Sequence, residues 1–170
     1  MAVTPPIVID LEPIVAGAAE GPLLVSSEPL SFWGGYDSRT GEIIDRRHSL
    51  AGRCGRRTIL VLPATRGSST TTAVLLESVR AGTAPAAIIV GDDRDTRAPS
   101  NAGDESDERS EPDRFLALAS IVAAEMYGAP IPLFTIARTE LWRLRSDARA
   151  TITPQGRLTV EAESRPDVDD

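Results

Sequence analysis

The chain has 170 residues, of which 41% are hydrophobic and only 4% aromatic, so aliphatic side chains must fill its core. All 18 basic residues are arginine, which excludes Schiff-base chemistry and a lysine-dependent phosphate loop. A single cysteine, Cys54, and a single histidine, His48, exclude an internal disulfide and a cysteine- or histidine-based metal site held by this chain alone.

The net charge of −7 is concentrated in two segments. Residues 92–113 carry a net charge of −6 and residues 161–170 carry −4, which leaves +3 on the rest of the chain. The insert 92–113 and the tail 162–170 have no apolar periodicity, so we expect both to be disordered. The remaining residues form no basic stripe with stacking aromatics, so nucleic acid is not an expected partner.

Hydropathy gives no sign of a membrane segment. No apolar run approaches the length of a membrane span, and no basic region at the N-terminus precedes a continuous apolar segment. We therefore expect a cytoplasmic protein with no membrane partner. Its length is that of a single domain over residues 1–170.

The first elements in chain order are strands. Residues 7–15, IVIDLEPIV, and residues 21–25 are apolar strands separated by AGAAEG. A polar-aromatic loop, SSEPLSFWGG, follows at residues 26–35. The Asp…Gly pattern in YDSRTGEII, residues 36–44, then predicts a turn before a short strand.

A strand–helix–strand unit comes next. RTILVLP, residues 57–63, reads as a strand covered on both faces. Residues 73–80 fit a helix of about two turns that ends at Ala81-Gly82, and APAAIIV, residues 84–90, is the next buried strand. This order predicts a right-handed parallel βαβ unit.

The pattern resumes after the acidic insert. Residues 115–127 have helical spacing, and GAPIPLFTI, residues 128–136, reads as another strand. ATITPQGRLTVEA, residues 150–162, predicts a hairpin around Gln155-Gly156. The fold class is therefore α/β with a parallel βαβ core.

One turn carries residues suited to chemistry, in LPATRGSSTTTAVLLE, residues 62–77. A phosphate cradle there would lack the lysine and the second glycine, and a serine nucleophile would have only His48, upstream in DRRHSLAG, as its base. Ser68, Ser69 or Thr70 would simply cap the helix in another interpretation. In the fourth interpretation, a serine oxygen acts as a base, and N–H groups and the helix dipole stabilise its alkoxide form. A partner chain would then supply the Lewis acid.

Three stretches resemble a known family. LLVSSEPLSFWGGYDSRTGEIIDRRHSLAG, ILVLPATRGSSTTTAVLLESVRAGTAPAAIIV and ALASIVAAEMYGAPIPL together resemble the small, swivelling-domain subunit of the aconitase X family, from Gly21 to about Thr135. SEPLSFWGG together with RGSS is the most specific part. EMYGAPIP and VLLESVRAGTAPAAI are more similar to the bacterial than to the archaeal branch.

The resemblance implies a fold and an activity. The fold is the three-layer β/β/α swivelling domain of the aconitases, here with a flexible acidic insert. The activity is that of a two-subunit hydro-lyase, in which a large partner subunit holds an iron–sulfur cluster and most substrate ligands. Bacterial members dehydrate cis-3-hydroxy-L-proline to Δ1-pyrroline-2-carboxylate, which we expect here once the large subunit is bound. The alternatives are the small subunit of mevalonate 5-phosphate dehydratase and a non-catalytic, regulatory swivelling module.

The resemblance also implies roles for the serine loop. Ser68 matches the catalytic base, which removes the proton α to the substrate carboxylate, although Ser69 is the alternative base. Ser69 and the N–H groups of Gly67 to Thr70 would stabilise an alkoxide or a carboxylate, and Arg66 would pair with the substrate carboxylate. Thr70 stands where the wider aconitases have arginine, so the substrate contacts are expected to differ there.

The loop at residues 27–35 is expected to face the same cleft. Glu28, Ser31 and Trp33 are its candidate substrate-binding residues. In the alternative interpretation, Phe32 and Trp33 only anchor a turn on the core.

Two residues are left outside the site. His48 is expected to be a surface or loop histidine. Cys54, which lies between GR and GRR, is expected to be incidental rather than redox-active.

Overall fold

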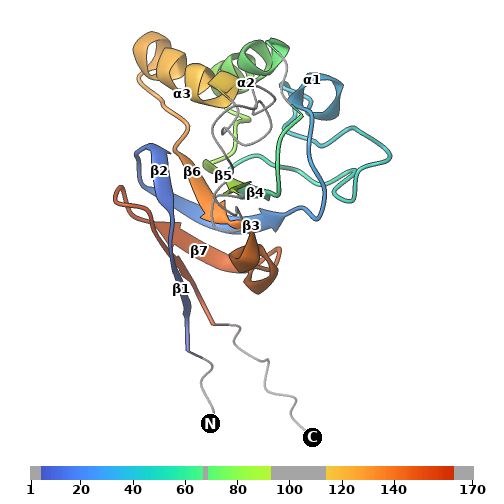
Figure 1. Cartoon of the computed structure of the whole chain (residues 1–170). Helices are drawn as coiled ribbons and strands as arrows, with labels where there is room; N and C mark the ends of the chain where they lie inside the picture. Colours follow the sequence, from blue (N-terminus) through green and yellow to red (C-terminus); the bar gives the residue numbers. More distant parts are fainter. Residues whose placement is uncertain (1–4, 67–68, 93–113, 163–170) are drawn as a thin grey trace, which may run out of the picture.

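The computed structural model describes residues 5–66, 69–92 and 114–162, and these form three layers (Figure 1). Helices cover one face of a parallel sheet, and a second set of strands covers the other face. In chain order the elements are β1 (Ile7–Asp10), β2 (Glu12–Val15), β3 (Ala19–Val25), α1 (Phe32–Gly35), β4 (Ile59–Leu62), α2 (Thr70–Ala81), β5 (Ala87–Asp92), α3 (Arg114–Tyr127), β6 (Leu133–Ala137), the 3-10 helix η2 (Arg138–Arg143), β7 (Arg149–Ile152) and β8 (Arg157–Val160).

The strands form one eight-stranded sheet in the order β1-β8-β7-β3-β4-β5-β6-β2. Strands β3 to β6 are parallel, whereas β1, β2, β7 and β8 pair antiparallel with their neighbours. The two edge strands β1 and β2 are separated in the chain only by Leu11, whose N–H donates to the carbonyl of Gly156 at 2.8 Å. The chain therefore passes directly from one edge strand of the sheet to the other.

Two hydrophobic cores separate the layers. Along β4, Leu60 and Leu62 face the core beneath the helices, whereas Ile59 and Val61 face the core between the two parts of the sheet. All four side chains are buried, which explains why the strand is continuously apolar. The predicted three-layer β/β/α architecture is confirmed.

The βαβ unit is confirmed, with one correction. Strands β4 and β5 are parallel and α2 connects them. The helix ends at Gly82 as predicted, in the left-handed conformation (φ 70°) that favours glycine. The expected length of about two turns was wrong, because Thr70 to Thr72 also join the helix and bring it to 12 residues.

The N-terminal prediction also needs correction. Residues 7–15 form two strands with different partners, and β3 begins at Ala19 rather than at residue 21. The short strand expected within residues 36–44 is reduced to isolated bridges, one of them between Tyr36 and Ile43. The C-terminal hairpin is confirmed, with Gly156 at φ 89° in its turn.

The predictions for the acidic insert and the tail fall almost entirely outside the described residues. Asp92, which the sequence placed in the insert, is instead the last residue of β5 and pairs with Ala137. None of the helices in the described ranges is long and apolar enough to cross a membrane.

Candidate functional site

Two loops leave the carboxyl ends of the neighbouring strands β3 and β4, and the backbone joins them. The Ser26 N–H donates to the carbonyl of Val61 at 2.9 Å. Further out, Leu30 and Thr65 form a parallel bridge, and the Arg66 N–H donates to the carbonyl of Leu30 at 3.0 Å. The parallel pairing therefore continues past the strands and places the two predicted site loops side by side.

Aromatic packing anchors the first loop. Phe32 is fully buried, and its ring centroid lies 5.6 Å from that of Tyr36. Trp33, the next residue, is 63% exposed, so only half of the anchoring interpretation is correct. Gly34 has a φ of 73°, which a residue with a side chain rarely adopts, and it forms part of a kink within α1. The sequence therefore buries Phe32 and presents Trp33 to solvent.

The polar candidates of the first loop are bound to the loop's own surroundings. Ser31 donates through its hydroxyl to the carbonyl of Trp33 at 3.0 Å. A carboxylate oxygen of Glu28, Oε1, accepts the Ser49 N–H at 2.5 Å. Both side chains are half-buried. They hold the loop in shape, and a role in substrate binding remains a prediction for each.

His48 lies in a turn next to the first loop, as the sequence analysis allowed, but not at the surface. It is only 6% exposed, so the surface part of that expectation was wrong. Its Nε2 lies 3.3 Å from the Ser26 hydroxyl, and its Nδ1 accepts the Leu50 N–H at 3.1 Å. The signal in the sequence was weak, because Ser26 lies 22 residues away. The histidine is the link between the turn after Asp45 and the start of the first loop.

The second loop leads into the N-terminus of α2. Ser69 is exposed at the N-cap position and makes no capping hydrogen bond with its side chain, so the capping interpretation is wrong for this serine. Arg66 is exposed. Gly67 and Ser68 lie outside the described residues, and their proposed roles stay predictions. The first N–H groups of a helix have no intrahelical acceptor, so this end favours an anion.

The threonines after Ser69 lie in the first turn of α2. Thr72 donates through its hydroxyl to the carbonyl of Phe115 at 3.1 Å and so ties α2 to α3. Thr71 is completely buried, and its hydroxyl has no hydrogen-bond partner within the described part of the chain. Buried hydroxyls are normally paired, so this one is unusual.

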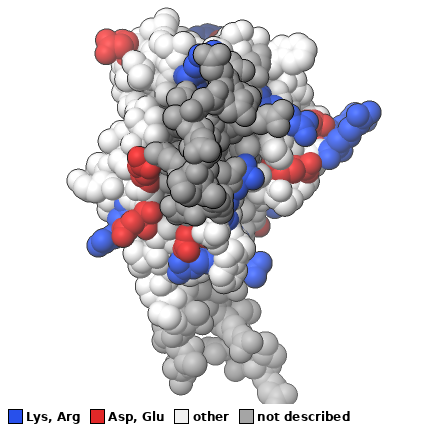
Figure 2. All heavy atoms as spheres, viewed as in Figure 1, with Lys and Arg blue, Asp and Glu red and all other residues white. Residues whose placement is uncertain are grey.

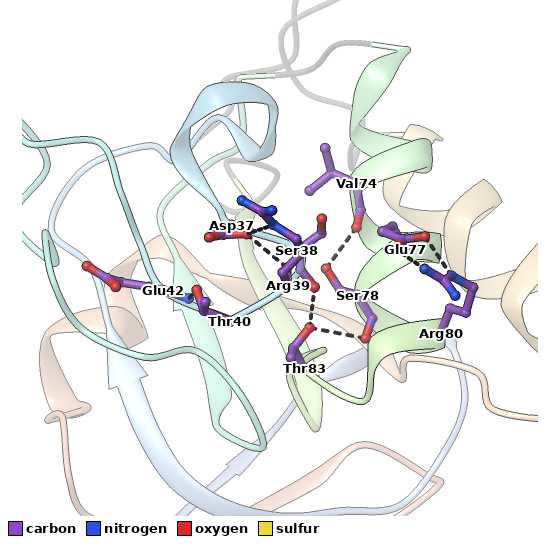
Figure 3. Close-up of polar contacts among 10 residues, drawn as sticks. All are labelled: Asp37, Ser38, Arg39, Thr40, Glu42, Val74, Glu77, Ser78, Arg80 and Thr83. Atoms are coloured by element: carbon purple, nitrogen blue, oxygen red, sulfur yellow. Dashed lines mark hydrogen bonds and ion pairs between the residues drawn. The ribbon is translucent and has the colours of Figure 1, made fainter.

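The far end of α2 is bound to the turn that follows the first loop. Tyr36 donates its phenol O–H to the carbonyl of Thr83 at 2.7 Å, and burial raises the pKa of this phenol well above its usual range. Thr83 in turn donates to the carbonyl of Ser38 at 2.6 Å (Figure 3). In the same turn, the backbone N–H of Arg39 holds the pKa of Asp37 below its usual value. The first loop is therefore fixed at both of its ends.

The chain does not supply the ligands of an iron–sulfur cluster. Such clusters are held mainly by several cysteine thiolates, and Cys54 is the only cysteine. It is exposed, and its sulfur lies 3.7 Å from the carbonyl of Thr40. Within residues 5–66, 69–92 and 114–162, no three His, Cys, Asp or Glu side chains gather closely enough to hold a metal ion. The residues present therefore do not fit a cluster.

An open groove of about 650 Å³ runs from the first loop to η2. Its lining includes Ser26, Leu50, Pro63, Trp142 and Arg145. Trp142 is 75% exposed, so both tryptophans of the chain project from segments that follow parallel strands. On the face in Figure 2, acidic and basic side chains are interspersed. Charge alone therefore does not mark the site on that face.

Comparison with known proteins gives a consistent result. The sequence model of a family described as the aconitase X swivel domain matches residues 8–98. A cis-3-hydroxy-L-proline dehydratase from Pseudomonas aeruginosa is 42% identical over 71% of this chain, which spans 17% of that protein. A phosphomevalonate dehydratase small subunit from Methanothermobacter thermautotrophicus is 46% identical over 48% of this chain and 62% of its own length.

A solved structure extends the similarity to nearly the whole chain. It is titled as the crystal structure of Thermococcus kodakaraensis aconitase X in its holo-form, and it is similar with a TM-score of 0.70 at 26% sequence identity. The superposition covers 93% of this chain and 99% of that one.

Proposed function

The chain belongs to the aconitase X swivel-domain family, and we propose that it is the small subunit of a two-subunit iron–sulfur hydro-lyase that dehydrates cis-3-hydroxy-L-proline. The observation that carries the proposal is the pair of joined loops beside the N-terminus of α2, where Arg66 donates its backbone N–H to Leu30. The relative from Pseudomonas aeruginosa supports this substrate, because its similarity extends over 71% of the chain.

In the proposed reaction, the substrate loses its α proton and its 3-hydroxyl group as water, and the resulting enamine tautomerises to Δ1-pyrroline-2-carboxylate. Ser68 takes the α proton. The N–H groups at the start of α2 stabilise the negative charge that develops on the serine oxygen or on the substrate carboxylate. Arg66 is exposed and suits the carboxylate as a bidentate partner. A cluster held by the large subunit would supply the Lewis acid for the departing hydroxyl group.

Two observations support a large partner chain. The Pseudomonas aeruginosa relative contains the matching region within a much longer chain, and the Methanothermobacter thermautotrophicus relative is named a small subunit. This chain also exposes 63% of Trp33 and 75% of Trp142. Tryptophan is enriched at protein interfaces, so we expect the partner to cover these side chains.

Co-expression with the large subunit tests the proposal. The purified complex should dehydrate cis-3-hydroxy-L-proline, and the isolated small subunit should not. Ser68→Ala should lower kcat by about 100-fold or more, as expected for loss of a general base, whereas Ser69→Ala, which removes the alternative base, should change kcat much less. Near-full activity of Ser68→Ala would refute the base assignment. A fully active large subunit on its own would instead indicate a regulatory module.

The second candidate substrate is mevalonate 5-phosphate. It is favoured by the 46% identity to the phosphomevalonate dehydratase small subunit, although that similarity covers a smaller share of this chain. Measuring kcat/KM of the same complex with both substrates separates the two candidates. A preference for mevalonate 5-phosphate would reassign the substrate and leave the role of the small subunit unchanged.

A further inference from the structure

The buried imidazole of His48 lies in a hydrogen-bond network in which the position of each proton follows from its neighbours. The Ser26 hydroxyl lies 2.6 Å from the carbonyl of Glu28, which can only accept, so the hydroxyl donates there. The same oxygen accepts the Glu28 N–H at 3.1 Å. It is then left to accept, not to donate, toward Nε2 of His48 at 3.3 Å.

The other ring nitrogen gives the same assignment. Nδ1 of His48 accepts the Leu50 N–H at 3.1 Å, so it carries no proton in this arrangement. The imidazole is therefore neutral with its proton on Nε2. One nitrogen holds the turn that contains Leu50, and the other holds the loop that begins at Ser26.

From this arrangement we propose that His48 is a positioning residue for the substrate-facing loops. Its Nε2–H fixes the Ser26 hydroxyl, and that hydroxyl fixes both backbone polar groups of Glu28. Two residues further on, the carbonyl of Leu30 accepts the N–H of Arg66. The histidine thus sets the position of Arg66 through the backbone and makes no contact with the substrate.

A second contact also joins the His48 segment to the first loop. The Glu28 carboxylate accepts the N–H of Ser49, which directly follows His48 in the chain. The first loop is therefore held by the His48 segment on two sides, at Ser26 and at Glu28. The inference rests on the proposed function only where it concerns catalysis. The arrangement of the loops can be measured in this chain without a partner.

Two substitutions separate the two ring nitrogens. In His48→Asn, the side-chain oxygen can replace Nδ1 as the acceptor for the Leu50 N–H, but no donor reaches Ser26. In His48→Gln, the amide nitrogen can replace the Nε2–H donor, but no acceptor is left for Leu50. Ser26→Ala removes the receiving hydroxyl. If His48 positions the first loop, Arg66 exchange and KM in His48→Gln should resemble those of the wild type. The same quantities in His48→Asn should resemble those of Ser26→Ala.

The first measurement is amide hydrogen exchange of Arg66, with the imidazole ¹⁵N shifts of the wild type as a check on the Nε2–H tautomer. Exchange at Arg66 should be about tenfold faster in His48→Asn and Ser26→Ala and near the wild-type rate in His48→Gln, in line with the loss of one hydrogen bond. In the complex, the first two variants should raise KM about tenfold and leave kcat nearly unchanged, because they weaken ground-state and transition-state binding equally.

Several results would overturn the inference. Unchanged exchange at Arg66 in both His48→Asn and Ser26→Ala would show that the loop does not depend on the Nε2–H. An Nδ1–H tautomer, or impairment of His48→Gln rather than His48→Asn, would give His48 only a structural role in the turn. If the wild-type complex lacks dehydratase activity, the proposed function fails, whereas the exchange measurement still decides the positioning role.

Discussion

Replacing Phe32 with alanine separates the role of the first loop from the stability of the domain. The Phe32 side chain is fully buried in the core beneath the helices and packs against the Tyr36 ring. Its removal should leave a cavity directly under Trp33 and Ser31. The loop then loses one of its two fully buried apolar side chains, and the other, Leu30, stays in the core beside Arg66.

The cost follows from the burial. A fully buried phenylalanine replaced by alanine costs about 3–5 kcal/mol of unfolding free energy. The contact with Tyr36 accounts for about 0.5–1.5 kcal/mol of this cost. A domain with a stability of about 10 kcal/mol, in the middle of the usual range, would still be almost fully folded in the absence of denaturant.

A control with matched stability makes the result interpretable. Leu158 in β8 is also fully buried, but it lies in the second core, between the two parts of the sheet. Leu158→Ala should lower the free energy of unfolding by about 2–5 kcal/mol, a range that overlaps that of Phe32→Ala. Urea unfolding of both variants gives the free energies, and kcat/KM of the complexes gives the activity. We expect Phe32→Ala to lose about tenfold or more in kcat/KM, equivalent to ~1.4 kcal/mol, and Leu158→Ala to keep its activity.

Two outcomes would refute this reasoning. If Phe32→Ala costs less than about 1 kcal/mol, the side chain is not the anchor that its burial indicates. If both variants lose activity in proportion to their folded fractions, the first loop has no role of its own in the reaction.

Three further predictions concern single substitutions. Tyr36→Phe removes the hydrogen bond to Thr83 and should lower the free energy of unfolding by about 1 kcal/mol. Because burial raises the pKa of Tyr36, the unfolding free energy of the wild type should fall as the pH rises above about 10, and that of the variant should fall less. Urea unfolding across this pH range measures both effects. Gly82→Ala should lower the free energy of unfolding in urea by about 1–2 kcal/mol, because φ is 70° there. Trp142→Ala should leave the melting temperature unchanged but raise the Kd for the large subunit about tenfold or more by calorimetry, whereas the exposed Met126 replaced by alanine should not.

The sequence predicted the elements whose pattern is local. The runs at β4 and β5 are continuously aliphatic because both faces of these strands are covered, and Gly82 ends α2 because few other residues adopt its backbone conformation. The two candidate loops were also located from the sequence, because glycine, serine and aromatic residues interrupt the apolar pattern there, and their role as a site stays a prediction. The resemblance then assigned roles within these loops.

What the sequence did not predict depends on contacts between distant segments. The segment at residues 7–15 reads as a single apolar strand, so nothing local shows that the chain changes partner from β8 to β6 at Leu11. The burial of His48 was missed for the same reason, since it depends on Ser26, 22 residues away in the chain. Phe32 and Trp33 are both large aromatic residues, so the sequence does not show which of them is buried and which is exposed.

The way the loops are bound also limits how this domain can move during a reaction. The first loop is fixed at its start by Ser26 and His48, at its middle by the Leu30–Thr65 bridge, and at its end by Phe32. Moving this loop alone toward a substrate would break backbone hydrogen bonds and expose a buried aromatic ring, which is costly. Approach to a substrate held by a partner is therefore easier as a rigid-body movement of the whole domain, with both loops carried together.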